Sequence, residues 1–310
     1  MYIITGATGH IGNNVTRFLV NKNQKVRVLV RKIDDSINDL PIDIKVGNIF
    51  DEDFLNEHIL ENDIVIHCAG YIDLLNKEKM QSFRTNYQGT KKIADLCLRK
   101  KNRFIYISSV DVIPKSKRGL VYEPISLTPK KMKTYYATSK AMATDYVLNQ
   151  ISNGLNALVL YPSAVIGVHD YKPSAAGKEI LSVLNHKILF SLNGGYNFID
   201  VKDVAKAIFI AANSSYRGHM ILSGEDQTIK SLYRSIEKAT TVPKLIIPLP
   251  TIIVRLAVFF SPKYSQMMIT KIKENYHYSN QEMKKHLIPE LTPFDQTIKE
   301  SIEWLVKYYL

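Results

Sequence analysis

The stretch TYYATSK at residues 134–140 holds a phenol and an ammonium group whose spacing could serve proton transfer. In a helix, residues four positions apart share a face, which pairs Tyr136 with Lys140 and leaves out Tyr135. A free tyrosine has a pKa of about 10, and a nearby ammonium group lowers it. Such a pair can protonate a carbonyl oxygen or deprotonate an alcohol. The same spacing also fits one turn of an ordinary amphipathic helix, so the other residues must decide between the two interpretations.

Two other polar segments could complete this chemistry. The apolar run that ends in YISSV is predicted to be a strand, so that Ser108 and Ser109 emerge at its carboxyl end. A serine there could hydrogen-bond a substrate oxygen and hold it against Tyr136. Asn86, in the segment RTNYQGT, is expected at the start of a helix. Its amide would hold a water molecule, or the backbone, near Lys140.

The segment TGATGHIG predicts a phosphate-binding turn, because it follows a short apolar run and opens a helical pattern. Gly6 permits a sharp turn, Gly9 lets the backbone approach a pyrophosphate, and Gly12 allows close packing of helix on sheet. The helix N-terminus supplies amide donors and the positive end of the helix dipole. The spacing GxxGxxG differs from the commoner GxGxxG, and a tight turn without a ligand is the alternative. The dinucleotide contacts expected here are Gly6, Thr8, Gly9, His10, Ile11 and Gly12.

The residues after the second apolar run bear on the choice of cofactor. An acidic side chain about 20 residues past the glycine turn would bind the ribose hydroxyls of NAD, whereas a basic one accommodates the 2′-phosphate of NADP. Here Arg31 and Lys32 occupy that place, and no acid occurs until Asp34. The pattern favours NADP(H), with Arg31 as the main contact and Lys32 as a helper, and leaves NAD possible. The alternative is a pair of basic side chains that only contact solvent.

The elements that must position these groups follow from the hydrophobic pattern. Short apolar, β-branched runs alternate with helical patterns, which predicts an α/β fold: a Rossmann-type, doubly wound parallel sheet with helices on both faces. Ligands of such sheets bind at the carboxyl ends of the strands. The predicted strands of the first half are residues 2–5, 25–30, 43–47, 63–69, 103–109 and 156–162.

The alternation of predicted strands and helices ends after residue 165. Loops and helices predominate from there on, with isolated strands predicted at 218–224 and 244–250. The segment FIDVKDVAKAI returns to the sheet domain, with Asp200 expected to cap a helix rather than to catalyse. We therefore predict an NAD(P)-binding Rossmann domain at residues 1–165, with 196–215 returning to it. The predicted substrate-binding lobe, which is smaller, comprises residues 166–195 and 216–310.

Composition excludes several classes of function. The chain has 310 residues with a net charge of +12, but its 41 Lys and Arg residues are scattered, so we expect no nucleic-acid partner. Two cysteines indicate a reducing, cytoplasmic location.

No signal peptide, transmembrane segment or metal site is expected. The apolar stretch 245–260 could still rest on a membrane or line a pocket. The helices near 93–98 and 146–148 could pair two subunits or face the sheet, which leaves monomer and homodimer open.

Taken in order, TGATGHIG, VIHCAG, TNYQGTKKI, YISSV, YYATSK, YPSAVIG and FIDVKDVAKAI resemble the extended short-chain dehydrogenase/reductase family over nearly the whole chain. The resemblance implies a Ser–Tyr–Lys catalytic set in which Ser109, with Ser108 as the second choice, joins Tyr136 and Lys140. It also implies that Lys140 binds the nicotinamide ribose. The further cofactor contacts that it implies are Cys68, Ala69, Gly70, Asn48, Ile49, Pro162, Ser163 and Val165.

Two positions depart from the family pattern. The family usually has an acid that reads the adenine amino group where this chain has Asn48, which would have to use its side-chain carbonyl. An arginine often precedes the proline after the sixth strand, and here that residue is Tyr161. Neither departure affects the chemistry.

The segment YPSAVIG narrows the resemblance. Sugar-nucleotide epimerases and dehydratases carry a Phe-Asn pair there, whereas Pro162 and Ser163 resemble the dihydroflavonol 4-reductase and 3β-hydroxysteroid dehydrogenase branch. The apolar runs 181–190 and 245–260 are consistent with a hydrophobic substrate or with ordinary core packing. We therefore predict NADPH-dependent reduction of a small ketone or aldehyde, or the reverse alcohol oxidation, with the loop 112–133 covering the pocket. The alternatives are a sugar-nucleotide epimerase or dehydratase with tightly held NAD, and a non-enzymatic NADP-sensing protein.

Overall fold

The computed structural model describes residues 1–73, 75–116, 118–254 and 266–310. Its main element is a parallel sheet with the strand order β10-β6-β5-β4-β1-β2-β3. The change of direction in this order lies between β1 and β4, the place where open parallel sheets bind ligands. The strands of this sheet are β1 (Tyr2–Thr5), β2 (Val26–Val30), β3 (Asp43–Val46), β4 (Ile64–His67), β5 (Arg103–Ile107), β6 (Ala157–Pro162) and β10 (Gly218–Leu222).

The central strands are buried on both faces, which is why their sequences are continuously apolar. In β5, Phe104 and Tyr106 enter one hydrophobic core, while Ile105 and Ile107 enter the other. Every residue of β1, β5 and β6 is buried. The predicted α/β class and parallel sheet are confirmed.

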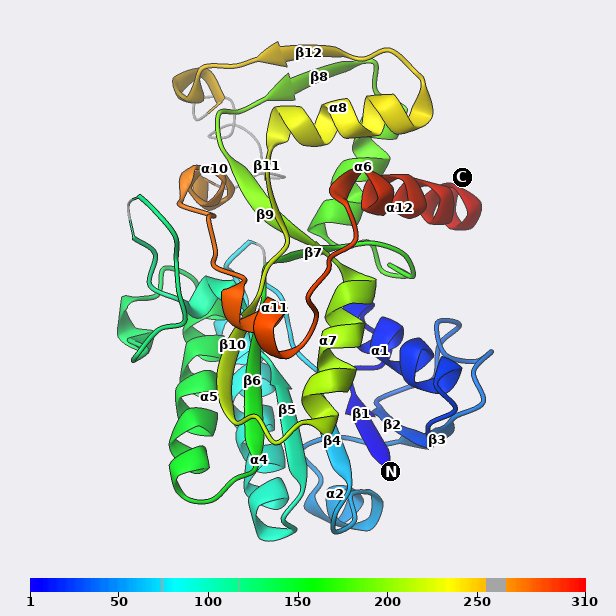
Figure 1. The fold of residues 1–310 in the computed structure, drawn as a ribbon, viewed down its shortest axis with the longest axis vertical. Helices are drawn as coiled ribbons and strands as arrows, with labels where there is room; N and C mark the ends of the chain where they lie inside the picture. The colour runs from blue at the N-terminus through cyan, green and yellow to red at the C-terminus, as the bar shows by residue number, and fades with distance from the viewer. Residues whose placement is uncertain (74, 117, 255–265) are drawn as a thin grey trace.

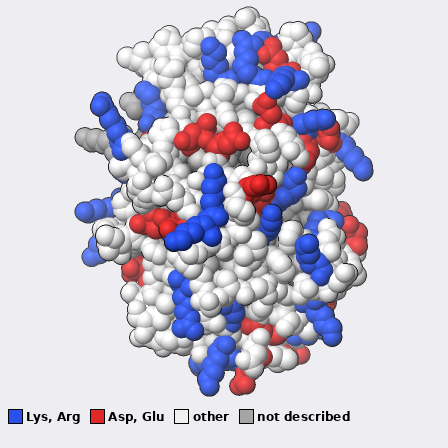
Figure 2. Space-filling model, viewed as in Figure 1, with Lys and Arg blue, Asp and Glu red and all other residues white. Residues whose placement is uncertain are grey.

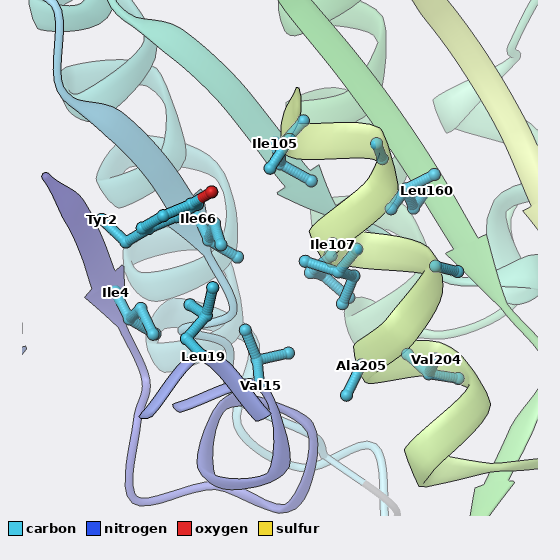
Figure 3. Close-up of a cluster of buried hydrophobic side chains, with 14 of the residues drawn as sticks. Tyr2, Ile4, Val15, Leu19, Ile66, Ile105, Ile107, Leu160, Val204 and Ala205 are labelled. Carbon is cyan, nitrogen blue, oxygen red and sulfur yellow. The ribbon is translucent and has the colours of Figure 1, made fainter. Parts of the chain in front are cut away.

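Helices cover both faces of the sheet, and Figure 1 shows α5 on one side of it and α1 and α7 on the other. The core beneath α1 and α7 contains Leu19 and Val204, packed against Ile4 and Leu160 of the strands (Figure 3). The opposite core includes Ile93 of α4. The bounds are α1 (His10–Asn21), α2 (Glu52–His58), α4 (Thr90–Arg99), α5 (Tyr135–Ser152) and α7 (Val201–Asn213).

A smaller lobe stands at the carboxyl edge of the large sheet (Figure 1) and has a third core of its own. It contains a sheet of β7 (Ala164–Ile166), β9 (Gly195–Asp200) and β11 (Glu225–Thr228), and a parallel pair of β8 (Ile188–Ser191) and β12 (Leu245–Pro248). Its helices are α6 (Ala175–Asn185), α8 (Ile229–Thr240), α10 (Gln266–Lys273) and α12 (Phe294–Tyr309).

The structure corrects one expectation and confirms another in this half of the chain. The run at 218–224 was expected to be an isolated strand of the smaller lobe, but β10 pairs with β6 as an edge of the large sheet. The short helix α11 (Gln281–His286) sends Met283 into the core of the large sheet. Asp200 caps α7 as predicted, since its carboxylate accepts the Lys202 amide at 2.7 Å.

Charged side chains are dispersed on the face seen in Figure 2, where small groups of Lys and Arg alternate with Asp and Glu. In the described ranges, no helix combines the length and the apolar character needed to cross a bilayer.

Candidate active site and dinucleotide site

The glycine turn between β1 and α1 is folded too tightly for larger residues. Gly6 has a φ of +76°, and a Cβ there would lie 2.5 Å from the Ala69 backbone nitrogen. A Cβ on Gly12 would lie 2.2 Å from the Gly6 oxygen. The turn therefore lies against the segment that follows β4 on one side and against the first turn of α1 on the other.

The N-terminus of α1 is free to receive an anion. Gly9 occupies the N-cap position, makes no side-chain cap, and no acidic residue follows in the first turn. The amides of His10 and Ile11 stand in that first turn, where a helix has no backbone acceptors for its N–H groups. Thr8 is half-buried beside them. This donor set fits the pyrophosphate of a dinucleotide.

The His10 side chain has a second task that the sequence did not indicate. Its Nε2 atom lies 3.0 Å from the Val168 oxygen, and Asn14 donates to the same oxygen at 3.0 Å. Burial lowers the pKa of His10, against the opposing charge of Asp170. The imidazole therefore fastens the loop after β7 to α1 and leaves the His10 amide to face a ligand.

The residues predicted to select the cofactor stand at the carboxyl ends of β2 and β3. Arg31 and Lys32 are exposed and have no ion-pair partner among the described residues. Asn48 is exposed, and its side-chain oxygen accepts the Phe50 amide at 3.1 Å, so one lone pair remains for a ligand. Ile49 packs next to Gly89 instead of facing solvent.

Tyr136 stands in the first turn of α5, which begins where Thr134 caps the helix by accepting the Ala137 amide at 2.9 Å. The phenol is half-buried and interacts with the Ser109 hydroxyl. Burial and then the nearby carboxylate of Asp111 raise the pKa of Tyr136 above its usual range, while Ser109 opposes them. The phenol is therefore protonated at neutral pH and has a proton to give, although the raised pKa makes it a weaker acid than a free tyrosine.

Lys140 lies one turn further along α5 and is 4% exposed. Its Nζ atom donates to the Ile107 oxygen at 2.6 Å and stands 4.6 Å from the ring centre of Tyr106. Burial lowers the pKa of Lys140 to about 7. We expected Lys140 to lower the pKa of Tyr136. It does not, because its ammonium is directed to the Ile107 oxygen and burial of the phenol raises the pKa of Tyr136.

Gly70 opens space in front of this lysine. A Cβ on Gly70 would lie 3.8 Å from Lys140 Nζ and 3.4 Å from Asn86 Oδ1. Ala69 and Cys68 connect Gly70 to β4, and the Cys68 amide donates to Thr5 at 3.0 Å. Burial raises the pKa of Cys68 to about 12, so the thiol stays neutral. The segment VIHCAG therefore lies between the glycine turn and Lys140.

Asn86 occupies a π-helical turn, η1 (Phe83–Gly89), between α3 (Lys79–Ser82) and α4, and not the start of a helix as expected. Its amide accepts the Tyr71 N–H at 2.7 Å and donates to the Tyr71 oxygen at 2.9 Å and to Ser139 Oγ at 3.0 Å. Such turns occur often at functional sites because they alter the direction of a side chain. Asn86 thus positions the backbone after Gly70, which is one of the two roles the sequence suggested.

The structure separates the two candidate serines. The Ser108 hydroxyl is 2.6 Å from Thr144 Oγ1 and 4% exposed, so it belongs to the core. Ser109 follows β5 and is half-buried, and its oxygen accepts the Asp111 amide at 3.1 Å. Ser109 is therefore the serine that faces Tyr136.

The residues after β6 include an unusual hydroxyl. Ser163 Oγ is buried and has no hydrogen-bond partner in the described part of the chain. Pro162 is buried at the end of β6, and Val165 is half-buried in β7. A buried hydroxyl without a partner is costly, and a ligand that bonds to it would remove that cost.

His67 is a central residue that the sequence analysis missed. Its ring bridges Thr5 Oγ1 at 2.6 Å and Thr90 Oγ1 at 3.0 Å, joining β1 and β4 to α4. Burial, and to a smaller extent the charge of Lys140, lowers the pKa of His67 to about 3. The ring is therefore neutral and structural; the position of His67 at the end of an apolar run could have indicated its burial, but not its partners.

The loop 112–133, which was predicted to cover the pocket, is tied to the C-terminal segment. Val121 bridges to Tyr278, and its amide donates to His277 at 2.7 Å. Lys115 pairs with Glu274 at 3.1 Å. Residue 117 lies outside the described residues. Whether the loop covers a substrate is not tested by these contacts and stays a prediction.

A charged cluster stands beside Tyr136, and the sequence analysis did not include it. The carboxylate of Asp111, two residues after Ser109, forms ion pairs with the Nζ atoms of Lys271 in α10 at 2.6 Å and of Lys115 at 3.9 Å. Of the apolar runs, 181–190 is divided between α6 and β8, and residues 255–260 of the second run lie outside the described residues. The described residues contain no cluster of metal-ligating side chains.

Comparisons with known proteins agree with this architecture. The model of the NAD dependent epimerase/dehydratase family matches residues 2–222. Sterol demethylase protein B of Methylococcus capsulatus is 25% identical over 252 residues, which are 80% of this chain and 77% of that protein. A candidate dihydroflavonol 4-reductase of Synechocystis sp. is 31% identical over 252 residues, 78% of this chain and 73% of that protein.

A solved structure shares the fold over the whole length. The Bordetella bronchiseptica enzyme WbmH, determined in complex with NAD+, superimposes with a TM-score of 0.80, covering 100% of this chain and 99% of that one at 21% identity. The family match extends from the glycine turn through the Tyr136 segment to β10. The chain therefore belongs to the NAD dependent epimerase/dehydratase family and is an NAD(P)-dependent enzyme of the extended short-chain dehydrogenase/reductase type.

Proposed function

We propose that this enzyme uses NADPH to reduce the carbonyl group of a small, hydrophobic ketone or aldehyde, or catalyses the reverse oxidation of an alcohol. The observation that carries the proposal is the meeting of Tyr136 and Ser109 at the carboxyl edge of the sheet. Lys140 lies behind Gly70 at the same edge. A protonated phenol, a hydroxyl and a buried amine beside a phosphate-binding turn are the groups that hydride transfer to a carbonyl requires.

Each side chain has a defined task in this proposal. NADPH supplies the hydride when it is bound. The Ser109 hydroxyl donates a hydrogen bond to the substrate carbonyl oxygen and orients it toward Tyr136. Tyr136 donates its proton to that oxygen as negative charge develops there. Lys140 binds the ribose hydroxyls of the nicotinamide half.

The proposed cofactor preference rests on Arg31 and Lys32. Two exposed cations without ion-pair partners in the described ranges stand where the 2′-phosphate of NADP would bind. We expect Arg31→Ala to weaken NADPH binding about tenfold or more and to change NADH binding by less than twofold, in equilibrium titrations followed by nicotinamide fluorescence. Equal affinity of the unaltered enzyme for both cofactors, unaffected by Arg31→Ala, contradicts the preference.

The substrate class rests on the chemistry of relatives and on this chain. The names of two relatives refer to a sterol and to a dihydroflavonol, both largely apolar ring compounds. Pro162 and Ser163 stand where sugar-nucleotide enzymes carry a Phe-Asn pair.

We also propose the cytoplasmic location that the sequence predicts, which rests on the two cysteines in 310 residues.

The experiment that tests the proposal is Tyr136→Phe, which removes one hydroxyl and leaves the ring. We expect NADPH affinity to stay within about twofold and turnover of a carbonyl substrate to fall about 10²- to 10⁴-fold, since general acid catalysis contributes that much. Tyr135→Phe is the matched control, because Tyr135 is 37% exposed and adjacent in sequence. A Tyr136→Phe enzyme with a tenth or more of the original turnover would show that another group is the acid.

One observation favours a second candidate, a sugar-nucleotide epimerase or dehydratase with tightly held NAD. The charged cluster of Asp111, Lys115 and Lys271 beside Tyr136 suits a polar, anionic substrate as well as an apolar one. Such an enzyme would retain nicotinamide nucleotide through purification and consume none, which absorbance of the purified protein would reveal. The other alternative, a non-enzymatic NADP sensor, gives no reason for the Tyr136–Lys140 pair.

A further inference from the structure

The loop between β7 and α6, residues 167–174, lies next to the N-terminal end of α1 although it leads into the smaller lobe (Figure 1). Besides the bonds from His10 and Asn14 to Val168, Arg17 of α1 donates to the Tyr171 hydroxyl at 3.0 Å. The hydroxyl of Tyr309, near the C-terminus, donates to the Tyr171 oxygen at 2.7 Å. Several independent bonds therefore hold this loop against α1.

This loop carries Lys172 to the mouth of the dinucleotide site. Its Nζ atom donates to Asp34 Oδ2 at 2.7 Å and lies 3.5 Å from the Thr8 oxygen. Thr8 belongs to the glycine turn, and Asp34 comes three residues after Arg31, so the ammonium spans the two parts of the site. The Lys172 side chain is 60% exposed and can turn toward an incoming ligand.

Asp34 is the acid that the sequence analysis noted as the first one after Arg31. Its other oxygen accepts the Ser36 amide at 3.1 Å, and the Ser36 hydroxyl donates to the same oxygen. Burial raises the pKa of Asp34, but the hydrogen bonds from Lys172 and Ser36 outweigh burial, so the pKa is lowered overall. The carboxylate is therefore ionised at neutral pH. A free carboxylate at this place would repel a 2′-phosphate and could accept the ribose hydroxyls of NAD.

We propose that Lys172 is a specificity-determining residue for the phosphorylated nicotinamide cofactor. By holding Asp34 in an ion pair it removes the carboxylate that would favour NAD, and it adds a third cation to Arg31 and Lys32 at the 2′-phosphate. This inference rests on the NADPH preference proposed above. Lys172 comes from a different segment of the chain, 140 residues after Lys32, which is why the local sequence pattern did not include it.

The test is calorimetric titration of NADPH, NADH, 2′,5′-ADP and 5′-AMP into five proteins: the unaltered enzyme, Lys172→Met, Asp34→Asn, the double variant and Lys25→Met. Lys25→Met is the matched control, since it makes the same change in net charge at the opposite end of β2, where the side chain is exposed. The fragments 2′,5′-ADP and 5′-AMP isolate the contribution of the 2′-phosphate without any turnover.

We expect Lys172→Met to weaken NADPH and 2′,5′-ADP about tenfold or more, and to leave NADH and 5′-AMP unchanged or slightly tighter. The double variant should bind NADPH at least threefold more tightly than Lys172→Met alone does, because a neutral amide then replaces the carboxylate of Asp34. Lys25→Met should change all four affinities by less than twofold.

Two results would overturn the inference. An equal loss for NADPH and NADH would show that Lys172 merely supports the loop, and an unchanged NADPH affinity would show that it does not reach the phosphate. If the unaltered enzyme itself binds NADH as tightly as NADPH, the proposed NADPH preference fails together with this inference, and the fragment titrations would show it as equal binding of 2′,5′-ADP and 5′-AMP.

Discussion

Replacing the buried Lys140 with methionine should stabilise this protein while it abolishes the proposed activity. Lys140 is 4% exposed, and burial lowers its pKa from 10.5 to about 7. A shift of this size corresponds to about 5 kcal/mol of destabilisation at pH 6, where the unfolded chain and the folded protein both carry the charge. Methionine leaves the Ile107 oxygen without its donor, which costs about 1–3 kcal/mol. The net gain for Lys140→Met at pH 6 is then about 2–4 kcal/mol.

The pH dependence of this difference isolates the cause. Between pH 7 and 10.5 the unfolded chain binds more protons at this lysine than the folded protein does, so the stability of the unaltered enzyme rises with pH. By pH 9 the penalty from Lys140 has fallen to about 2 kcal/mol. The advantage of Lys140→Met should therefore shrink by about 3 kcal/mol between pH 6 and pH 9.

Urea-induced unfolding of the nucleotide-free proteins at pH 6, 7, 8 and 9 measures this difference as a free energy of unfolding. Lys187→Met is the control, since Lys187 is exposed and the variant removes the same charge. Its free energy of unfolding should differ from that of the unaltered enzyme by a constant amount. If the Lys140→Met difference is also constant across this range, the lysine does not carry a lowered pKa and the reasoning from its burial is wrong.

Three further variants test the remaining groups of the site. Asp111→Asn removes the carboxylate that raises the pKa of Tyr136, so the limb of the pH–rate profile that reports Tyr136 should move to lower pH, and movement to higher pH would contradict this assignment. Ser109→Ala should lower the turnover number about 10²- to 10³-fold, as loss of a hydrogen bond to a developing oxyanion does. Ser108→Ala should mainly cost about 1 kcal/mol of stability, by loss of its bond to Thr144, and comparable turnover losses in both serine variants would refute the distinction between them.

The large sheet was predictable because its central strands are buried on both faces and therefore have continuously apolar sequences. The position of β10 in the sheet could not be predicted, because its sequence indicates a strand but does not indicate that the strand pairs with β6. The turn before α1 was predicted from its glycines. Thr134, which the sequence analysis did not use, marks the start of α5 by the same kind of local backbone chemistry. These local signals located most of the candidate site.

The parts that escaped prediction depend on contacts between distant segments. The side chain of Lys140 is directed by its hydrogen bond to the Ile107 oxygen. The spacing of residues along a helix cannot predict this contact, because Ile107 lies in another element. The π-turn that aims Asn86 at Tyr71 arises inside a continuous helix and leaves no pattern of its own. The charge beside Tyr136 comes partly from Lys271, more than 130 residues later in the chain.

The path of the chain has a mechanical consequence. The backbone leaves the large sheet after β6, returns through α7 and β10, leaves again at β11, and comes back a second time as α11 before ending in α12. Neither lobe is one continuous stretch, so no single peptide bond can act as a hinge between them. Opening around a ligand would have to bend every crossing together, which makes adjustments of individual loops the easier motion and makes separate expression of either half a poor way to study it.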